Sequence, residues 1–372
     1  MYLAWKEMHH SKGRFFFMMV IIALLSYLVL FVSGLANGLA SDNASAIEKY
    51  GNRTFILQKD ADNRINRSAL TSGTVTTLRD KLGRENTVLL GIQTTTINQT
   101  GKEQKIDASF FSVNPSGSFK PELAAGRQPS VNSTVDIIID RSIAKSGIHL
   151  NDTIMEQSSG LKFKIIGFTK AATYLHTPVA YVNARQWNMM MQKETGGNAR
   201  ANSEYTAVLT PDTSHEIDRL TRNAGLSQKI SGASLSTIIQ SLPGYSAEQG
   251  SLLMMISFLF IISIFILGIF FYIITAQKSV QFGILKAIGT GTGYLMRSLI
   301  FQTLLVLLFS LAVSLLLTWL TAAILPAGMP FSLPVGTIIK ILAAFIGVSV
   351  FSIVISIYQV IKINALSAIE GR

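Results

Sequence analysis

The sequence predicts an α-helical membrane protein with four transmembrane helices and one extracellular α+β domain inserted between the first and second spans. Three observations lead to this prediction. The 372 residues are 49% hydrophobic and only 14% charged, with a mean hydropathy of +0.39. Four windows, residues 15–41, 249–277, 298–339 and 341–361, contain no Asp, Glu, Lys or Arg. The segment between the first two windows holds 19 of the 21 acidic residues, as expected of a domain in water.

The charge-free windows are long enough to cross a membrane. A helix rises about 1.5 Å per residue and the hydrocarbon core is about 30 Å thick, so about 20 residues make one span. Pro326, Pro330 and Pro334 divide the third window, because proline interrupts helices. The predicted order is a cytoplasmic N-terminal segment (1–14), the first span (15–40), the extracellular domain (41–248), the second span (249–277), a cytoplasmic coupling helix and loop (278–297), the third span (298–325), a short outer loop (326–334), the fourth span (335–361) and a cytoplasmic tail (362–372).

The first span has an alternative interpretation as a cleaved signal peptide. Its basic start and the small residues at 36–40 fit such a signal. Its apolar stretch, however, exceeds the roughly 7–15 residues usual for a signal peptide, so we expect a retained anchor.

The flanking cations predict the orientation. Residues 41–248 hold 23 Lys and Arg and 19 Asp and Glu, whereas the other 164 residues hold 9 basic and 2 acidic ones. Cytoplasmic loops of membrane proteins carry such a basic excess. Here it lies at Lys6, Lys12, Arg14, Lys278, Lys286, Arg297, Lys362 and Arg372. We therefore expect a multi-pass protein of the cell membrane with both termini in the cytoplasm, and no nucleic-acid partner.

The inserted domain is expected to mix short strands and short helices. Stretches rich in Val, Ile and Thr, bounded by Gly, Asn, Asp and Pro, are typical of strands. We expect strands at 54–58, 88–96, 135–139, 161–168, 179–182 and 205–209, and helices at 41–50, 142–148, 184–191 and 215–224.

Several kinds of active site are excluded by the residues present. The chain has no cysteine, so it has no thiolate metal site and no cysteine nucleophile. It has no phosphate-binding G-x-x-x-x-G-K-[ST] motif, and Gly289, Gly291 and Gly293 follow a span rather than a strand. His215-Glu216 lacks the second histidine of a zinc protease. We expect no catalytic site, no metal site and no nucleotide site in this chain.

The segment after the second span has the pattern of a short amphipathic helix. Val280, Ile284, Ala287 and Ile288 recur at helical spacing, while Lys278, Gln281 and Lys286 are polar. Such a helix lies along a membrane surface. It is either a simple connector or a helix that docks on a cytoplasmic protein and transmits force to the two spans it joins.

This segment also carries a family resemblance. Residues 281–289, Gln-Phe-Gly-Ile-Leu-Lys-Ala-Ile-Gly, resemble the E-F-G-[IV]-L-[KR]-A-[IL]-G stretch of FtsX-like, MacB-type ABC transporter permeases, with Gln281 in place of the usual Glu. Residues 126–129, 135–139 and 151–154 resemble the family's G-R-x-P, E-V-V-[IL] and G-D-x-[IL] stretches, with Asn151 in place of Gly. Residues 364–366 resemble its closing P-x-x-A-L. The resemblance covers essentially the whole chain.

Within the family, residues 5–8, 33–40 and 244–249 are similar to the haem-exporting permeases of Gram-positive bacteria. The resemblance implies a homodimer of permeases in membrane lipid, bound to a separate cognate ATPase that carries the ATP. Haem would be cargo, and no cofactor would be bound permanently. The residues that the resemblance assigns to coupling with the ATPase are Gln281, Phe282, Gly283, Leu285, Lys286 and Gly289.

Gly34 and Gly38 form a G-x-x-x-G motif at the outer end of the first span. Small residues four apart let helix backbones approach closely. The motif predicts either a dimer seam or close packing within one subunit.

A stripe at the start of the second span is the predicted ligand site. Tyr245, Glu248 and Met255 fall on one helix face, with a carboxylate that is costly beside a membrane unless it is used or solvated. Haem iron accepts oxygen, nitrogen and sulfur donors, so this face could bind haem. Packing and an interfacial position are the alternatives for Met255 and Tyr245. Tyr174 and His176, in a turn-rich stretch, are further possible iron contacts.

Three functions fit these patterns. The first is a permease subunit that expels haem using a partner's ATP hydrolysis. The second keeps the architecture but exports a lipoprotein, peptide or antibiotic. The third is a relay without transport, in which the spans pass ATPase motion outward to activate a cell-wall hydrolase. Only the exporters need a ligand site near the second span.

Overall fold

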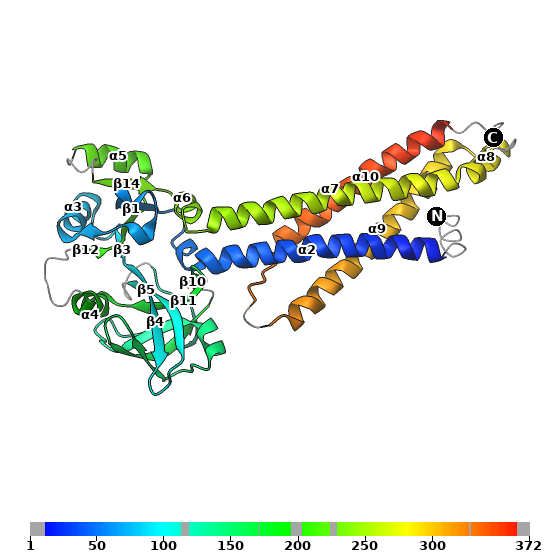
Figure 1. The fold of residues 1–372 in the computed structure, drawn as a ribbon. Helices are drawn as coiled ribbons and strands as arrows, with labels where there is room; N and C mark the ends of the chain where they lie inside the picture. The colour runs from blue at the N-terminus through cyan, green and yellow to red at the C-terminus, as the bar shows by residue number, and fades with distance from the viewer. Residues whose placement is uncertain are drawn as a thin grey trace. The chain divides into compact units, whose positions relative to one another are not determined.

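Two units make up the described chain (Figure 1). The computed structural model describes residues 12–112, 119–170, 172–194, 203–223, 229–326 and 329–362. Residues up to Gly38 and from Gly250 onward form the membrane unit, and Leu39–Gln249 form the inserted domain. The stretches at 5–8 and 364–366 used for the family resemblance lie outside the described residues.

The membrane unit contains helices long and apolar enough to span a bilayer, and this confirms the four predicted spans. A further short helix, α8, follows the second of them. The bounds are α2 Lys12–Glu48, α7 Tyr245–Gln277, α8 Ser279–Ala287, α9 Thr292–Ile324 and α10 Val335–Lys362.

Aliphatic and aromatic side chains from all four long helices pack into one core. It includes Ile22 and Leu30 of α2, Leu267 of α7, Val306 of α9 and Phe345 of α10, each at most 1% exposed. Hydroxyl groups add bonds between helices. They include Tyr27 Oη to Thr321 Oγ1 at 3.0 Å and Ser310 Oγ donating to Met19 O at 3.1 Å.

The inserted domain is built from short strands and helices, as predicted for an α+β domain. Its strands are β1 Thr54–Gln58, β2 Leu70–Thr71, β3 Val88–Leu90, β4 Ile92–Gln99, β5 Lys105–Ser112, β6 Leu123–Gly126, β7 Asp136–Asp140, β8 Thr153–Glu156, β9 Lys162–Thr169, β10 Thr173–Tyr174, β11 Thr177–Val182, β12 Ser203–Tyr205, β13 Ala207–Thr210 and β14 Ile230–Ala233. Its helices are α3 Ser72–Leu82, α4 Ala184–Glu194, α5 Ser214–Asn223 and α6 Leu235–Gln240, with 3-10 turns at Lys59–Ala61, Ile65–Arg67 and Arg141–Ser146.

Six of the strands close into a barrel. The pairing runs β11–β5–β4–β8–β9–β7 and returns from β7 to β11, with parallel pairs at β11–β5 and β7–β9. Alternate residues point to opposite faces of a strand. Ile137 and Ile139 of β7 therefore belong to one core cluster, with Phe110 and Phe163, while Ile138 belongs to a second cluster on the other face. Burial on both faces explains the continuous apolar run of this strand.

A four-stranded antiparallel sheet, ordered β14-β1-β13-β3, completes the domain. Its strand β1 is buried on both faces, since Ile56 joins the first core cluster and Phe55 and Leu57 join the second. The second cluster also takes in Ile47, near the end of α2.

One buried carboxylate fastens the turn between β8 and β9. Glu156 is fully buried and accepts hydrogen bonds from Thr95 Oγ1 at 2.6 Å, from the amides of Ser158 and Ser159 at 2.7 Å each, and from Ser159 Oγ. Burial alone would raise the pKa of Glu156. The hydrogen bonds from Ser159, Thr95 and Ser158 outweigh that effect and hold its pKa below the ordinary value.

Four predicted elements differ from the observed ones. The helix expected at 142–148 is the 3-10 turn Arg141–Ser146, and the strand expected at 205–209 is divided between β12 and β13. The strand expected at 88–96 is two strands, β3 and β4, because Gly91 ends the first. A Cβ at Gly91 would lie 2.4 Å from the Trp187 ring, and its amide donates to Ser112 Oγ at 2.7 Å. The helix expected at 41–50 is the continuation of α2, which runs unbroken to Glu48.

Candidate functional site

Glu248, in the first turn of α7, is the centre of a small polar cluster in the inserted domain. Its Oε2 accepts a 2.9 Å hydrogen bond from Nδ2 of Asn43 and lies 4.0 Å from Nε2 of His176. The other ring nitrogen of His176, Nδ1, lies 2.9 Å from Oδ2 of Asp42. We call Asp42, Asn43, His176 and Glu248 the Glu248 cluster. The side chains of Glu248, Asp42 and His176 are 26%, 29% and 46% exposed, so a ligand can reach them.

A strained turn places His176 in this cluster. The hairpin of β10 and β11 turns at Leu175 and His176, whose φ angles of +48° and +61° are left-handed. Such angles cost an ordinary residue about 1–2 kcal/mol each. The turn is held on α2 by its own amides. Leu175 N donates to Asn43 O at 3.0 Å and His176 N to Asp42 O at 3.3 Å. These two hydrogen bonds hold the strained turn and so place the His176 imidazole beside the Asp42 and Glu248 carboxylates.

The other residues of the predicted ligand stripe have different surroundings. Tyr245 is half-buried and packs against the second core cluster of the inserted domain. Met255, on the same helix, belongs to the membrane unit and is 44% exposed. Tyr174 is fully buried, so it reaches no ligand without unpacking, whereas His176 lies next to Glu248.

Span α7 is the least buried of the four spans in the part of the chain that the structure describes. In its most apolar stretch 11% of residues are buried, against 44% in α2 and in α9 and 28% in the described part of α10. Met255 lies in this exposed face, with Leu253, Met254, Phe258, Ile261 and Ile262. The face is available for lipid, a second copy or an amphiphilic ligand.

Gly34 and Gly38 pack against a segment of their own chain. A Cβ at Gly34 would lie 2.3 Å from the Phe331 ring, and a Cβ at Gly38 would lie 2.3 Å from the carbonyl oxygen of Pro330. Ser332 N donates to Gly34 O at 3.0 Å. Of the two alternatives for this motif, the structure favours packing within one subunit, because the glycine surface is already covered.

The coupling segment forms helix α8, with two distinct faces. Phe282 and Gly283 are buried and Leu285 and Lys286 are half-buried. Phe282 packs with Leu295 and Leu299 of α9, near Leu285. The exposed face carries Val280, Gln281, Ile284, Ala287, Ile288 and Gly289. The residues that the resemblance assigns to ATPase coupling are thus divided between an inner face that holds α9 and an outer face that is open.

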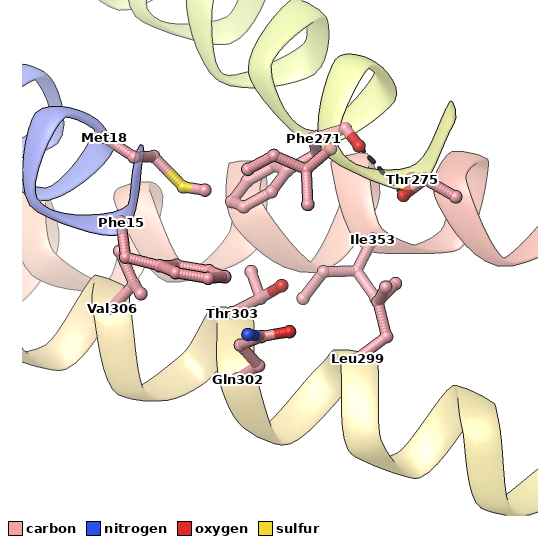
Figure 2. A pocket seen from close by; sticks show the side chains of 10 residues that line it. Phe15, Met18, Phe271, Thr275, Leu299, Gln302, Thr303, Val306 and Ile353 are labelled. Carbon is pink, nitrogen blue, oxygen red and sulfur yellow. Dashed lines mark hydrogen bonds between the residues drawn. The ribbon is translucent and has the colours of Figure 1, made fainter. Parts of the chain in front are cut away.

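A buried lysine joins α8 to the spans. Lys278 precedes α8 and is 7% exposed. Its Nζ donates a 2.8 Å hydrogen bond to Oε1 of Gln302 and lies 5.5 Å from the centre of the Phe15 ring. Figure 2 shows Gln302 and Phe15 in the same small gap between the helices, with Thr275 and Thr303. The gap has room for about one water molecule, so it is a packing joint rather than a ligand site.

Within the described residues, no three His, Asp or Glu side chains lie close enough together to hold a metal ion. The Glu248 cluster therefore offers one or two donors to a ligand, not a closed metal site.

Comparisons with known proteins give the family. Residues 253–365 match the family described as FtsX-like permease C-terminal. The chain is 30% identical over 372 residues to a protein named as the hemin transport system permease HrtB of Staphylococcus epidermidis, with 100% of this chain and 99% of the relative covered. The chain belongs to the FtsX-like permeases of ABC transporters.

One further relative agrees with this membership. The protein of the same name from Staphylococcus haemolyticus is 27% identical over 375 residues, covering 100% of this chain and 99% of that protein. Among solved structures, the extracellular domain of the noncanonic ABC-type transporter YknZ from Gram-positive bacteria matches with a TM-score of 0.34 and 18% identity, covering 49% of this chain and 100% of that domain. The family resemblance seen in the sequence is confirmed.

Sequence reasoning about this FtsX-like permease missed part of the cluster. Asp42 and Asn43 lie on the extension of α2 and were assigned to a separate short helix, so nothing connected them with Glu248. The sequence places Lys278 among the orienting cations and among the polar residues of the amphipathic helix, whereas the structure buries it. Lys278 directly follows the charge-free window at 249–277, and a cation in that position is the signal that could have indicated its burial.

Proposed function

We propose that this permease expels haem from the membrane, driven by a separate ATPase subunit. Two observations support the proposal. The chain is similar over its full length to a relative named for hemin transport. It also places a partly exposed carboxylate, Glu248, in the first turn of a helix that continues as an apolar span. The second observation carries the proposal, because haem is an amphiphile with a donor-seeking iron and an apolar ring.

The proposed ligand face lies along the start of α7. Tyr245, Glu248 and Met255 are spaced by three and seven residues and so share one side of this unbroken helix. Glu248 would supply an oxygen donor to the iron, while the exposed apolar side chains around Met255 would meet the ring. Since Asn43 Nδ2 already bonds to Glu248 Oε2, haem would have to replace that hydrogen bond.

The ATPase would drive transport through the exposed face of α8. Val280, Ile284 and Ile288 are 51%, 49% and 74% exposed, an apolar stripe that a soluble helix would bury against a partner. A cognate ATPase docked there, carrying the ATP, would push α8. Phe282 and Lys278 would pass the push to α9 and α2. Helices α2 and α7 each run from the membrane unit into the inserted domain, so they provide a path outward.

The proposed arrangement is a homodimer with both termini in the cytoplasm and the inserted domain outside. The cation distribution along the sequence supports this orientation. The exposed face of α7 supplies apolar area for a second copy. The chain itself would have no catalytic role.

A haem titration of the purified permease tests the proposal. We expect the wild-type protein to shift the haem Soret band with saturation, and Glu248→Ala to weaken the apparent affinity at least tenfold. Glu103→Ala removes an exposed carboxylate between β4 and β5. It is the matched control and should bind haem as wild type does. Unchanged haem binding by Glu248→Ala would refute the assignment. Absence of haem binding by the wild type, with intact ATPase coupling, would favour another cargo or a relay.

A further inference from the structure

The inserted domain contains a cavity at the end of α2, separate from the Glu248 cluster. Its volume is about 390 Å³, and its lining includes Lys49, Tyr50, Phe119, Lys120, Glu122 and Tyr181. Small-molecule sites have volumes of roughly 300–1,000 Å³, so the cavity fits one or two rings and is too small to enclose a tetrapyrrole.

Two buried phenols in the lining have hydroxyl groups without partners in the described chain. Tyr50 and Tyr181 are 4% and 5% exposed, yet neither hydroxyl forms a hydrogen bond with a described residue. Both residues line the cavity, where a guest can accept hydrogen bonds from their hydroxyls. Burial raises the pKa of both phenols, so each keeps its proton and acts as a donor. The cavity therefore offers two donors to an acceptor oxygen.

Aromatic surfaces form the wall of the cavity. The rings of Tyr50 and Phe119 lie 5.0 Å apart, and the guanidinium of Arg53 stands 4.6 Å from the centre of the Phe119 ring. The two rings pack on each other and both line the cavity, so they give it an apolar aromatic wall.

The charges around the cavity favour a single negative charge in the guest. Lys49, Lys120 and Arg53 are cations, and Glu122 and the buried Asp140 are carboxylates, which leaves a net charge of +1. Lys49 Nζ donates to Lys170 O at 2.6 Å, while Lys120 is exposed at the rim. A monoanionic guest would neutralise this surplus.

We propose that this cavity binds a small aromatic carboxylate of one or two rings. The ring lies against Phe119 and Tyr50, the carboxylate accepts from the Tyr50 and Tyr181 hydroxyls, and Lys120 closes the rim. The proposal goes beyond haem export, because the cavity shares no residue with the Glu248 cluster.

Calorimetric titration of the full-length protein in lipid nanodiscs tests this site, with indole-3-acetate as the probe. We expect saturable binding of one probe per chain. Indole-3-acetamide, which is neutral, and tryptamine, which is cationic, should bind at least tenfold more weakly, since only the carboxylate is a charged acceptor.

Tyr→Phe variants keep the aromatic rings and remove only the hydroxyl groups, so they measure what the hydroxyls contribute to binding. Tyr50→Phe and Tyr181→Phe should each weaken indole-3-acetate binding about tenfold, while haem binding stays as in wild type. Lys120→Gln should weaken indole-3-acetate binding severalfold. Because Lys120 is exposed, this change leaves the packing of the core intact. Lys162→Gln, an exposed lysine of β9, is the control and should change nothing. Absence of saturable binding, equal affinity for the three indoles, or full affinity in the Tyr→Phe and Lys120→Gln variants would overturn the proposal.

Discussion

The buried bond between Lys278 and Gln302 provides a quantitative test of the joint beside α8. Lys278→Met keeps an unbranched, apolar stem but removes the ammonium. The lost hydrogen bond from a charged group is worth about 1.5–3 kcal/mol and the contact with Phe15 about 0.5–2 kcal/mol. Releasing a charge from a 7% exposed position recovers several kcal/mol of desolvation cost. The two effects nearly cancel, and we expect stability within about 2 kcal/mol of wild type.

Gln302→Leu should behave differently, because it leaves the ammonium buried without this acceptor. We expect it to destabilise by about 1–3 kcal/mol, more than Lys278→Met does. The double variant should recover part of that loss, giving a coupling energy above about 1 kcal/mol. Thermal unfolding in detergent, followed by intrinsic fluorescence, ranks the three variants by stability. If Lys278→Met is the least stable of them, or the effects simply add, the energetic reasoning is wrong.

The same variants report on force transmission. Lys278→Met should keep ATPase binding and basal hydrolysis but lower haem export several-fold, because α8 loses its polar tie to α9. A variant that exports at the wild-type rate would show that Phe282 packing alone transmits the movement.

Three other changes have clear expected outcomes. Gly38→Ala should destabilise the membrane unit by about 1–3 kcal/mol, because its Cβ would meet backbone atoms, whereas Gly268→Ala, with open space around it, should not; equal melting temperatures would contradict the packing. Glu156→Gln should cost about 1–3 kcal/mol at pH 7. Since the folded pKa of Glu156 is lowered, its contribution is present above the ordinary pKa and is lost as pH falls through the folded pKa. Variant and wild type should therefore converge in urea unfolding only at pH values below the folded pKa. Ile284→Glu on the exposed face of α8 should lower co-purification of the ATPase at least tenfold while Val280→Ala lowers it less, and full recovery of the ATPase by Ile284→Glu would exclude this docking face.

The spans and the fold class could be predicted from the sequence because they depend on local physical properties. A window without charges that is long enough to cross lipid has few other stable arrangements. Strand β1 was predicted with its observed bounds, since three apolar residues at its centre lie between polar stretches. The run at 135–139 was identified as a strand for the same reason, although its burial on two faces was not foreseen.

The barrel and the Glu248 cluster could not be predicted because they depend on contacts between distant segments. Strand β11 pairs in parallel with β5, far back in the chain, and no local pattern encodes that choice. Asp42, His176 and Glu248 come from three elements separated by more than 70 residues along the chain. His176 reaches the cluster through a left-handed turn that its residue types do not favour.

The two faces of α8 were ambiguous for a different reason. Val280, Ile284 and Ile288 form one apolar stripe and Phe282 and Leu285 form another, so periodicity alone did not say which one packs inside. The structure buries Phe282 against α9 and leaves the first stripe open. Docking of the ATPase is therefore proposed at the first stripe.

Haem efflux from proteoliposomes tests the central claim most directly. The permease would be reconstituted with its cognate ATPase, and haem leaving the bilayer would be captured by apo-myoglobin and followed by absorbance. We expect efflux that requires ATP, falls at least tenfold in Glu248→Ala and is unaffected in Glu103→Ala. ATP-dependent efflux that persists at the wild-type rate in Glu248→Ala would contradict the central claim.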